Sequence, residues 1–211
     1  PYTDFLWNGT LKTAPEMAAI LGGAGISQDD SVLIYGECQP CGGGPSAATY
    51  VYWIMKYLGH GNVSLLDGGM DDWVKAGEPT AAAALHLLPV NYTPRLKEDL
   101  LSSYSFVKSG GAQIIDVRGA AEFEAGSVPS GINIPYDLVL GGKRIKDDAS
   151  LGSLFSSLDK GRPVVVYTNT GVKASMIWLA LTLLDYDASI YSWRDWQANS
   201  APDIPGKTEG K

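Results

Sequence analysis

The sequence is poor in the residues that build metal centres, disulfide scaffolds and nucleic-acid sites. Its 211 residues include 2 cysteines and 2 histidines, and its 16 lysines and arginines are outnumbered by 23 aspartates and glutamates. So few cysteines exclude a disulfide-rich scaffold, and neither histidine stands at the spacing of a zinc finger. The formal net charge of -7 argues against binding to nucleic acid or to anionic membranes. We therefore predict no metal, no cofactor and no nucleic-acid partner.

Long apolar runs are also missing. A helix that spans a bilayer needs about 18–20 consecutive apolar residues, and no run in the sequence approaches that length. The apolar residues, 45% of the chain, are instead spread over many short runs, and they suffice for the cores of two small domains. We predict no membrane span, and both a bacterial periplasm and a cytoplasm are compatible with this composition.

What the sequence does contain is one long segment that occurs twice. Each copy has an apolar, β-branched run, a short loop with glycine, an amphipathic helix, and a short strand that leads to a tryptophan; the copies cover residues 32–73 and 164–196. A Pro-Tyr pair precedes each copy, at Pro1 and at Pro135. The whole unit is too long for a solenoid repeat and indicates duplicated domains.

Strands and helices alternate in both copies, which predicts an α/β fold with mainly parallel sheets. The apolar run at residues 32–35 is typical of a strand that is covered on both faces. The other predicted elements are helices at 14–23, 46–58, 70–75 and 96–108 and around Glu122, and strands at 63–66 and 114–117. The predicted domains are residues 1–77 and 95–211, with a proline- and alanine-rich linker at 78–94.

The two loops of the repeat differ at the residue that decides their chemistry. A glycine-rich turn between a strand and a helix aims backbone N–H groups into one concavity, which favours an anion. A cysteine at the lip of such a cradle becomes nucleophilic because its thiolate is stabilised. The first loop is Cys41-Gly42-Gly43-Gly44-Pro45-Ser46-Ala47, and the second is Thr168-Asn169-Thr170-Gly171-Val172-Lys173-Ala174.

These motifs resemble the tandem rhodanese family of thiosulfate and 3-mercaptopyruvate sulfurtransferases over nearly the whole chain. Asp116-Val117-Arg118, Glu122 and residues 126–135 are similar to one signature of the family, and residues 66–69 with Trp73 and Gly77 are similar to another. The resemblance implies two rhodanese-like domains, each with a mainly parallel sheet flanked by helices.

In active members of the family the loop reads Cys-x-x-Gly-x-[Arg/Lys/Thr/Ser]-[Ala/Ser], and its cysteine carries a persulfide. The resemblance therefore implies that Cys41 is catalytic and that substrate is bound by Gly42, Gly43, Gly44, Ser46 and Ala47. It also implies a degenerate second site at Thr168, Gly171 and Lys173. The implied partners are a small sulfur donor and an acceptor, which is a thiol, a protein or cyanide. No arginine follows Cys41 at the spacing that a phosphatase loop needs.

Two features depart from the family pattern. Tandem members usually carry the working cysteine in the second domain, whereas here it lies in the first. Residues 36–40 also separate Cys41 from its strand and supply Cys38, which creates a Cys-x-x-Cys pair. Three interpretations stay open: Cys38 resolves the persulfide, the two cysteines form a plain disulfide in a non-catalytic binding module, or the pair is a dithiol redox site.

The first copy also lacks a counterpart of residues 113–134, which supply a strand and a helix before the second Pro-Tyr pair. We therefore expect the first domain to be amino-terminally incomplete and to be completed by a segment before Pro1 or by a partner chain. Three further residues have less specific interpretations. Lys173 either binds an anion or is a solvated residue at a helix start, His60 is expected in a surface turn, and His86 supports no assignment.

Overall fold

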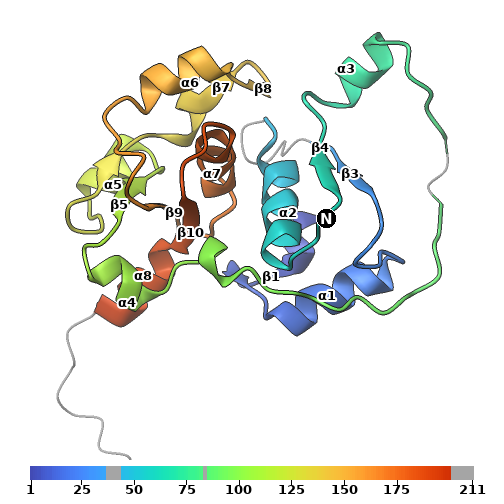
Figure 1. Cartoon of the computed structure of the whole chain (residues 1–211), viewed down its shortest axis with the longest axis horizontal. Helices are drawn as coiled ribbons and strands as arrows, with labels where there is room; N and C mark the ends of the chain where they lie inside the picture. The colour runs from blue at the N-terminus through green and yellow to red at the C-terminus, as the bar shows by residue number, and fades with distance from the viewer. Residues whose placement is uncertain (37–43, 83–84, 201–211) are drawn as a thin grey trace, which may run out of the picture.

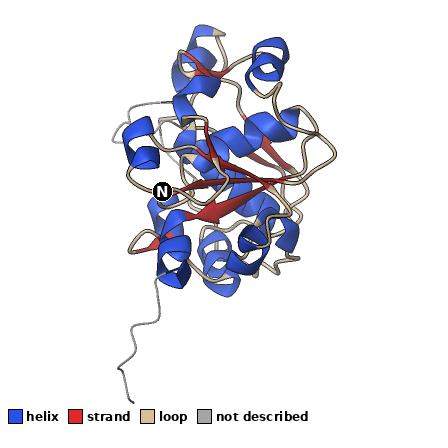
Figure 2. Cartoon of the chain, turned by 90° about the vertical axis from the view of Figure 1, so that its left-hand side faces the viewer, coloured by secondary structure: helices blue, strands red, loops and turns tan. Residues whose placement is uncertain are grey.

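The computed structural model describes residues 1–36, 44–82 and 85–200. In the second half of the chain these residues build a parallel sheet with the strand order β10-β9-β5-β6. Figure 2 shows its strands lying between helices. The strands are β5 (Gln113–Asp116), β6 (Ile132–Asn133), β9 (Val164–Thr168) and β10 (Ala188–Ser192).

The central strand β9 is buried on both faces, as a continuous apolar run predicts. Val164 and Val166 pack on the face that is covered by helix α7 (Ala174–Leu183). Val165 and Tyr167 pack on the opposite face, with residues of α4 (Tyr104–Lys108) and α8 (Trp193–Ser200). The alternation follows from the two-residue period of a strand, and it gives the sheet helices on both sides.

The first half has a smaller parallel sheet of two strands, β3 (Val32–Ile34) and β4 (Val63–Leu65). Helices α1 (Ala14–Gly23), α2 (Ser46–Tyr57) and α3 (Met70–Lys75) accompany it. Helix α1 begins where its sequence signals predict, because Thr13 and Glu16 form a capping box and Pro15 stands in the first turn.

The order of the elements repeats along the chain (Figure 1). In each half a short 3-10 helix is followed by a β-hairpin, a helix, a strand, a loop, a helix, a strand and a helix. In the first half the 3-10 helix and hairpin are η1 (Tyr2–Phe5), β1 (Leu6–Trp7) and β2 (Thr10–Leu11). In the second they are η4 (Tyr136–Val139), β7 (Leu140–Gly141) and β8 (Arg144–Ile145), and helix α6 (Asp148–Leu154) follows. Only the second half precedes this order with α4, β5, α5 (Ala120–Glu124) and β6.

The two halves share one hydrophobic core, which they build chiefly by packing α2 against α7 (Figure 1). A buried hydrogen bond of 2.7 Å joins the Thr49 and Ser175 hydroxyls across this contact. The linker also packs on the first half, since Tyr92 is buried and the Arg95 amide donates to the Leu58 carbonyl. The halves are therefore held together by a continuous apolar interior.

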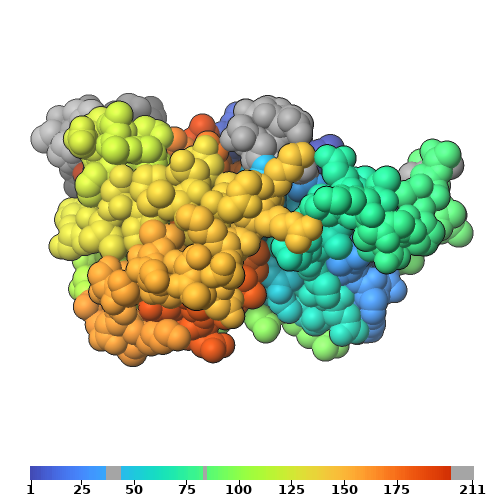
Figure 3. Space-filling model, turned by 90° about the horizontal axis from the view of Figure 1, so that it is seen from above, coloured from blue at the N-terminus to red at the C-terminus, as the bar shows by residue number. Residues whose placement is uncertain are grey.

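A second connection runs from the β7–β8 hairpin to the segment around α3. Arg144 pairs with Asp72 at 2.9 Å and with Asp67 at 3.5 Å, and Lys143 pairs with Asp71 at 3.3 Å. Figure 3 shows the yellow-orange hairpin segment against the green segment of the first half. The hydrogen bond from Arg144 holds the pKa of the Asp72 carboxyl below its usual value. Because these charges are exposed, each pair contributes little to stability.

The helix predicted at residues 96–108 is wrong. The chain instead forms a 3-10 helix, η3 (Glu98–Leu100), then a bridge between Leu101 and Ile190, and only then α4. The Ser102 amide donates to the Ile190 carbonyl, and the Ser103 hydroxyl caps α4 by accepting from the Phe106 amide. Pairing with the edge strand β10 outweighs the local preference for helix at the start of this segment.

Two predictions about burial are also wrong. Strand β3 is not covered on both faces, because Leu33 is 48% exposed and Tyr35, just beyond it, is 56% exposed.

His60 is buried instead of lying in a surface turn. Its Nε2 faces the Asp30 carbonyl at 2.8 Å, its Nδ1 faces the Tyr92 hydroxyl at 3.2 Å, and its ring stacks on Tyr92. Burial raises the pKa of Tyr92 to about 12, so its phenol stays protonated. Among the described residues, no helix is long and apolar enough to cross a bilayer.

Candidate functional site

The first loop is described from Gly44 onward, so the predicted residues Cys38, Cys41, Gly42 and Gly43 lie outside the described residues. Gly44 is buried with a φ of +76°, a backbone conformation that favours glycine. A Cβ at Gly44 would stand 3.2 Å from Leu140 Cδ1 of the β7–β8 hairpin. The end of the loop therefore lies against the second half of the molecule.

Ser46 and Ala47 begin helix α2, as the sequence predicts. Ser46 is 1% exposed, and its Oγ has no hydrogen-bond partner among the described residues. Ala47 is half-buried and lines a cavity of about 550 Å³ beside strand β3. An unpaired buried hydroxyl is costly, by about 1–3 kcal/mol. Ser46 thus offers a free hydrogen-bonding group at the start of the helix that follows the cysteine loop.

The second loop is described in full and is closed by its own threonine. Thr168 ends strand β9, is 6% exposed, and accepts a hydrogen bond of 2.9 Å from the Gly171 amide to its Oγ1. Gly171 has a φ of +83° and packs against Tyr50 of α2. The Gly171 amide therefore donates to the Thr168 hydroxyl and is not available to a ligand in this cradle.

The two loops share a conformation at their matching glycines, Gly44 and Gly171, whose φ angles are +76° and +83°. A Cβ added at either glycine would also meet the opposite half of the molecule: Leu140 at 3.2 Å from Gly44, and Tyr50 at 3.6 Å from Gly171, where Ile190 of its own half is nearer at 3.4 Å. Their helices, α2 and α7, lie side by side in Figure 1. The two candidate cradles consequently flank the same contact between the halves, a relation that depends on tertiary packing and that the sequence did not reveal.

Lys173 is engaged by an aromatic ring. Its Nζ lies 4.0 Å from the centroid of the Tyr136 ring, within the range of a cation–π contact. Neither of the two interpretations drawn from the sequence included this neighbour. Tyr136 is the tyrosine of the second Pro-Tyr pair, so the contact ties the loop to the segment that leaves β6.

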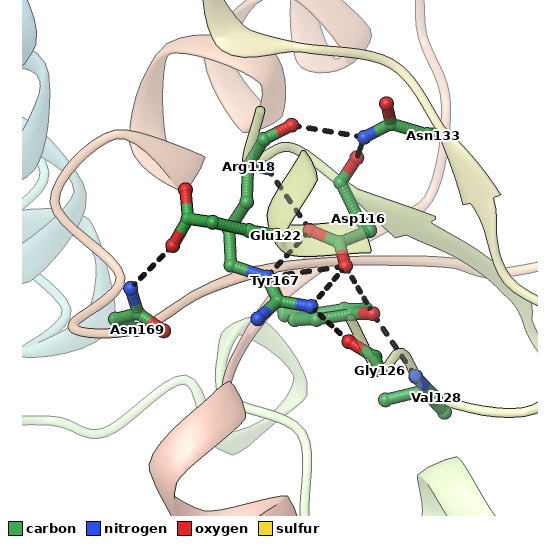
Figure 4. A network of polar contacts seen from close by, with 8 residues as sticks. All are labelled: Asp116, Arg118, Glu122, Gly126, Val128, Asn133, Tyr167 and Asn169. Carbon is green, nitrogen blue, oxygen red and sulfur yellow. Dashed lines mark hydrogen bonds and ion pairs between the residues drawn. The ribbon is translucent and has the colours of Figure 1, made fainter. Parts of the chain in front are cut away.

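A buried ion pair lies beside the second loop, at the end of strand β5 (Figure 4). Arg118 donates from Nε to Asp116 Oδ1 at 2.9 Å and from Nη2 to Asp116 Oδ2 at 2.6 Å. Arg118 is 6% exposed and Asp116 is fully buried. Burial acts to lower the pKa of Arg118, but its hydrogen bonds and ion pair with Asp116 outweigh this and raise the pKa above its usual value. Arg118 therefore keeps its charge beside Asp116.

Other groups complete this network. The Tyr167 hydroxyl donates to Asp116 Oδ2 at 2.6 Å and accepts from the Val128 amide at 3.0 Å. Burial, reinforced by Asp116, raises the pKa of Tyr167. Arg118 Nη2 also donates to the Gly126 carbonyl at 2.7 Å. The network joins β5, β9 and the segment before β6. It therefore helps to fix the position of β9, the strand that leads into the second loop.

The second half of the chain matches a known family of domains. The model of the rhodanese-like domain matches residues 103–199, which contain the four-stranded sheet, the second loop and the buried ion pair. Residues 103–199 therefore form a rhodanese-like domain. The match also confirms the family resemblance that the Asp116-Val117-Arg118 motif indicated.

Curated relatives match more of the chain. It is 27% identical over 210 residues to a thiosulfate sulfurtransferase of Corynebacterium glutamicum, an alignment that covers 85% of this chain and 67% of that protein. It is 26% identical over 224 residues to the 3-mercaptopyruvate sulfurtransferase of Mus musculus, with 96% and 73% covered. Sulfurtransferases are thus its relatives along most of its length.

Solved structures agree on the fold. The 3-mercaptopyruvate sulfotransferase SseA from Escherichia coli matches with a TM-score of 0.75 at 24% identity, over 87% of this chain and 74% of that one. EanB matches with a TM-score of 0.82 at 17% identity, over 95% of this chain and 57% of that one. At these identities the likeness concerns the fold alone, which is the α/β rhodanese fold with a parallel sheet between helices.

In this rhodanese-like domain the mouth of the second loop is polar. The Asn169 side chain donates to Glu122 Oε1 at 3.0 Å (Figure 4), and the Asn169 backbone carbonyl accepts from the Ser192 hydroxyl at 3.2 Å. A shallow cavity of about 440 Å³ opens here, lined by Arg118, Glu122, Ala125, Gly126, Asn169, Trp193, Arg194 and Gln197. The sequence motifs indicate Glu122 as a site residue but not Asn169. The signal that could have identified Asn169 is its position directly after Thr168.

Proposed function

We propose that this chain is a sulfurtransferase that carries sulfane sulfur as a persulfide on Cys41. The rhodanese-like domain at residues 103–199 and the sulfurtransferases among its curated relatives support the reaction class. The first loop fits the family motif at Cys41, Gly44 and Ser46, and the second has threonine at the cysteine position. The proposed nucleophile is therefore in the first half of the chain.

The observation that carries the proposal is the buried Ser46 hydroxyl without a partner among the described residues. It stands in the first turn of α2, two residues after Gly44, whose left-handed conformation matches that of Gly171. A persulfide anion on Cys41 would accept a hydrogen bond from Ser46 and be stabilised by the amino-terminal end of α2. We assign Gly42, Gly43 and Ala47 to the same cradle.

The proposed transfer has two steps. The Cys41 thiolate attacks the terminal sulfur of the donor, the donor's S–S or C–S bond breaks, and its electron pair leaves with the remainder of the donor. An acceptor thiolate or cyanide then attacks the outer sulfur, and Cys41 departs as the thiolate. With no acceptor, the Cys38 thiolate attacks the inner sulfur, expels hydrosulfide and leaves a Cys38–Cys41 disulfide.

The charge of the loop favours one class of donor. Residues 41–47 contain neither lysine nor arginine. A dianion such as thiosulfate gains most from a basic loop, because opposite charges at close range stabilise its binding. The neutral loop therefore favours a less charged donor, 3-mercaptopyruvate or a protein persulfide.

We further propose two rhodanese-like domains at residues 1–77 and 95–211, with residues 78–94 as linker. The repeated element order, the matching loop glycines and the helix pair α2–α7 support this division. Under it, the second domain is catalytically silent, because the Thr168 hydroxyl cannot form a persulfide. The role of the second domain is then to cover the first cradle, with Leu140 next to Gly44.

The proposed function is tested by intact mass. The reduced Cys38→Ser protein, which lacks the thiol that would resolve the persulfide, is incubated with 3-mercaptopyruvate or thiosulfate, desalted and weighed. We expect a gain of one sulfur atom, larger in yield with 3-mercaptopyruvate, and its removal by cyanide as thiocyanate. No gain from either donor would contradict the proposal. In that case, reversible cycling of the wild-type protein between dithiol and disulfide would indicate a redox protein, and its absence a binding module.

The silence of the second domain gives a separate prediction. Thr168→Cys places a thiol where Oγ1 now accepts from the Gly171 amide, so the stabilising amide is already in position. In the Cys38→Ser background, which retains its persulfide, we expect the variant to gain two sulfur atoms where the protein with Thr168 gains one. Thr168→Ser is the matched control, because it keeps the hydroxyl and should still gain one. Sulfur loading of a Cys41→Ser protein with Thr168 intact would show that the assignment of the nucleophile is wrong.

A further inference from the structure

A cavity of about 1040 Å³ opens in the second half of the chain. It is lined by residues of α4, α8 and β5, by the segment that leads into β6, and by the segment between α6 and β9. Helices α4 and α8 pack side by side at the lower left of Figure 1. Binding pockets for drug-sized ligands measure about 300–1,000 Å³, so this cavity has room for a ligand with more than one ring.

The cavity lies away from both candidate cradles. The second cradle starts at Thr168, the last residue of β9, whereas the cavity is lined by Gln113, the first residue of β5, and by Arg162, just before β9. Strands β5 and β9 are parallel, with Gln113 opposite Val164, so this lining marks the opposite end of the sheet. No described residue of either loop lines the cavity. A ligand bound here would therefore leave the cradles free.

The floor of the cavity is apolar. Several of its lining residues are buried members of the smaller core cluster: Val107, Ala112, Ile114 and Val128. The rings of Tyr104 and Trp196, whose centroids are 5.3 Å apart, line the cavity as well and are only partly buried. A flat apolar body would cover these side chains and displace water from them, which favours its binding.

The rim of the cavity is cationic, although the chain as a whole has 23 aspartates and glutamates against 16 lysines and arginines. The exposed residues Lys108 and Arg162 are among the described residues that line it, and no aspartate or glutamate is. Lys108 Nζ lies 5.4 Å from the centroid of the Tyr104 ring, a cation–π contact beside the aromatic wall. Neither cation forms an ion pair with a described carboxylate. Two such cations beside apolar walls attract an anion.

We propose that this cavity binds an organic anion, a molecule with one acidic group on an aromatic body of more than one ring. The acidic group pairs with Lys108 and Arg162. The rings lie against Tyr104 and Trp196 and over the apolar floor. Burial of the rings supplies the affinity, and the cations supply the preference for a negative charge. The binding does not depend on sulfur transfer, so the two proposals stand or fall separately.

Two fluorescent probes test the site on the purified full chain. Anilinonaphthalene sulfonate carries one sulfonate, and N-phenylnaphthylamine has the same rings without it. We expect the sulfonate probe to bind saturably at one site per chain, and more tightly than the uncharged probe. Salt should weaken its binding, because salt screens the exposed cations. Thiosulfate, which has no apolar surface to bury, should displace the sulfonate probe no more than sodium chloride of the same ionic strength does.

A double variant removes the cationic rim. Lys108→Met with Arg162→Met keeps apolar side chains at both positions and loses both charges. It should weaken the binding of the sulfonate probe about tenfold and change that of the uncharged probe less than about twofold. Lys75→Met with Arg95→Met is the matched control, because it also removes one exposed lysine and one exposed arginine, neither of which lines the cavity. The control should bind both probes as the wild type does.

The tryptophans report where the probe binds. In the nuclear magnetic resonance spectrum of the wild type, the sulfonate probe should shift the indole signal of Trp196, assigned with Trp196→Phe. It should leave the signal of Trp7, which is 72% exposed in the first half. The proposal is overturned if the uncharged probe binds as tightly as the sulfonate probe, if the two double variants bind the sulfonate probe equally, or if Trp7 shifts as much as Trp196. If the cavity variant does not fold, as judged by circular dichroism, the wild-type measurements with the two probes decide the question.

Discussion

Replacing Cys41 with serine is expected to lower sulfur transfer at least about a thousandfold, to the uncatalysed background, because removing a nucleophile removes the covalent intermediate. Cys38→Ser is expected to keep both sulfur loading and cyanolysis, since cyanide attacks the outer sulfur on Cys41 directly. The two variants differ by one cysteine position and are each other's control. Thiocyanate formation with 3-mercaptopyruvate as donor measures both.

The Cys38 variant also separates the possible roles of that residue. If Cys38 resolves the persulfide, loaded wild-type protein releases hydrosulfide and forms a disulfide when no acceptor is added, whereas loaded Cys38→Ser retains its sulfur. Alkylation of the reduced protein near neutral pH should label Cys41 faster, because the cradle stabilises its thiolate. Equal labelling of both cysteines, or transfer that survives in Cys41→Ser, would count against the persulfide proposal.

Some elements have local sequence signals, and the first and last residues of two of them could be predicted from the sequence. Helix α1 was predicted at its observed bounds, because Thr13, Pro15 and Glu16 define its start within one turn. Helix α3 was likewise predicted at its observed bounds. Strand β5 and the glycine positions of both loops follow from short patterns of the same kind.

Features that depend on distant contacts could not be predicted. Residues 96–108 were expected to be one helix, but Leu101 pairs with Ile190, whose position no local pattern indicates. His60 looked like a turn residue between two glycines, yet Tyr92 from the linker covers it. Among the site residues, the sequence indicated Thr168 and Ser46, but the packing of Gly171 on Tyr50 required the fold.

The second large effect is expected from the buried ion pair of the rhodanese-like domain. Arg118→Ala should lower the free energy of unfolding by about 3–5 kcal/mol, because it leaves Asp116 buried without its counter-charge. Asp116 would keep only the Tyr167 hydroxyl and the Arg118 backbone amide as hydrogen-bond donors. The guanidinium also stacks on the Trp193 ring, with its centre 4.3 Å from the ring centroid, and that contact would be lost too.

Arg144→Ala is the matched control, because it removes another arginine that pairs with an aspartate at hydrogen-bond distance. Arg144 pairs with Asp72 at 2.9 Å, but their side chains are 45% and 38% exposed, so water already screens the pair. Its removal should cost far less stability than that of Arg118, and less still at high salt. Urea unfolding followed by tryptophan fluorescence measures both variants, with Arg118→Lys as an intermediate that keeps the charge but loses the two-pronged contact. Equal losses from Arg118→Ala and Arg144→Ala would show that burial does not set the strength of the Asp116 pair, and that the segment before β6 is held on the sheet by its apolar contacts instead.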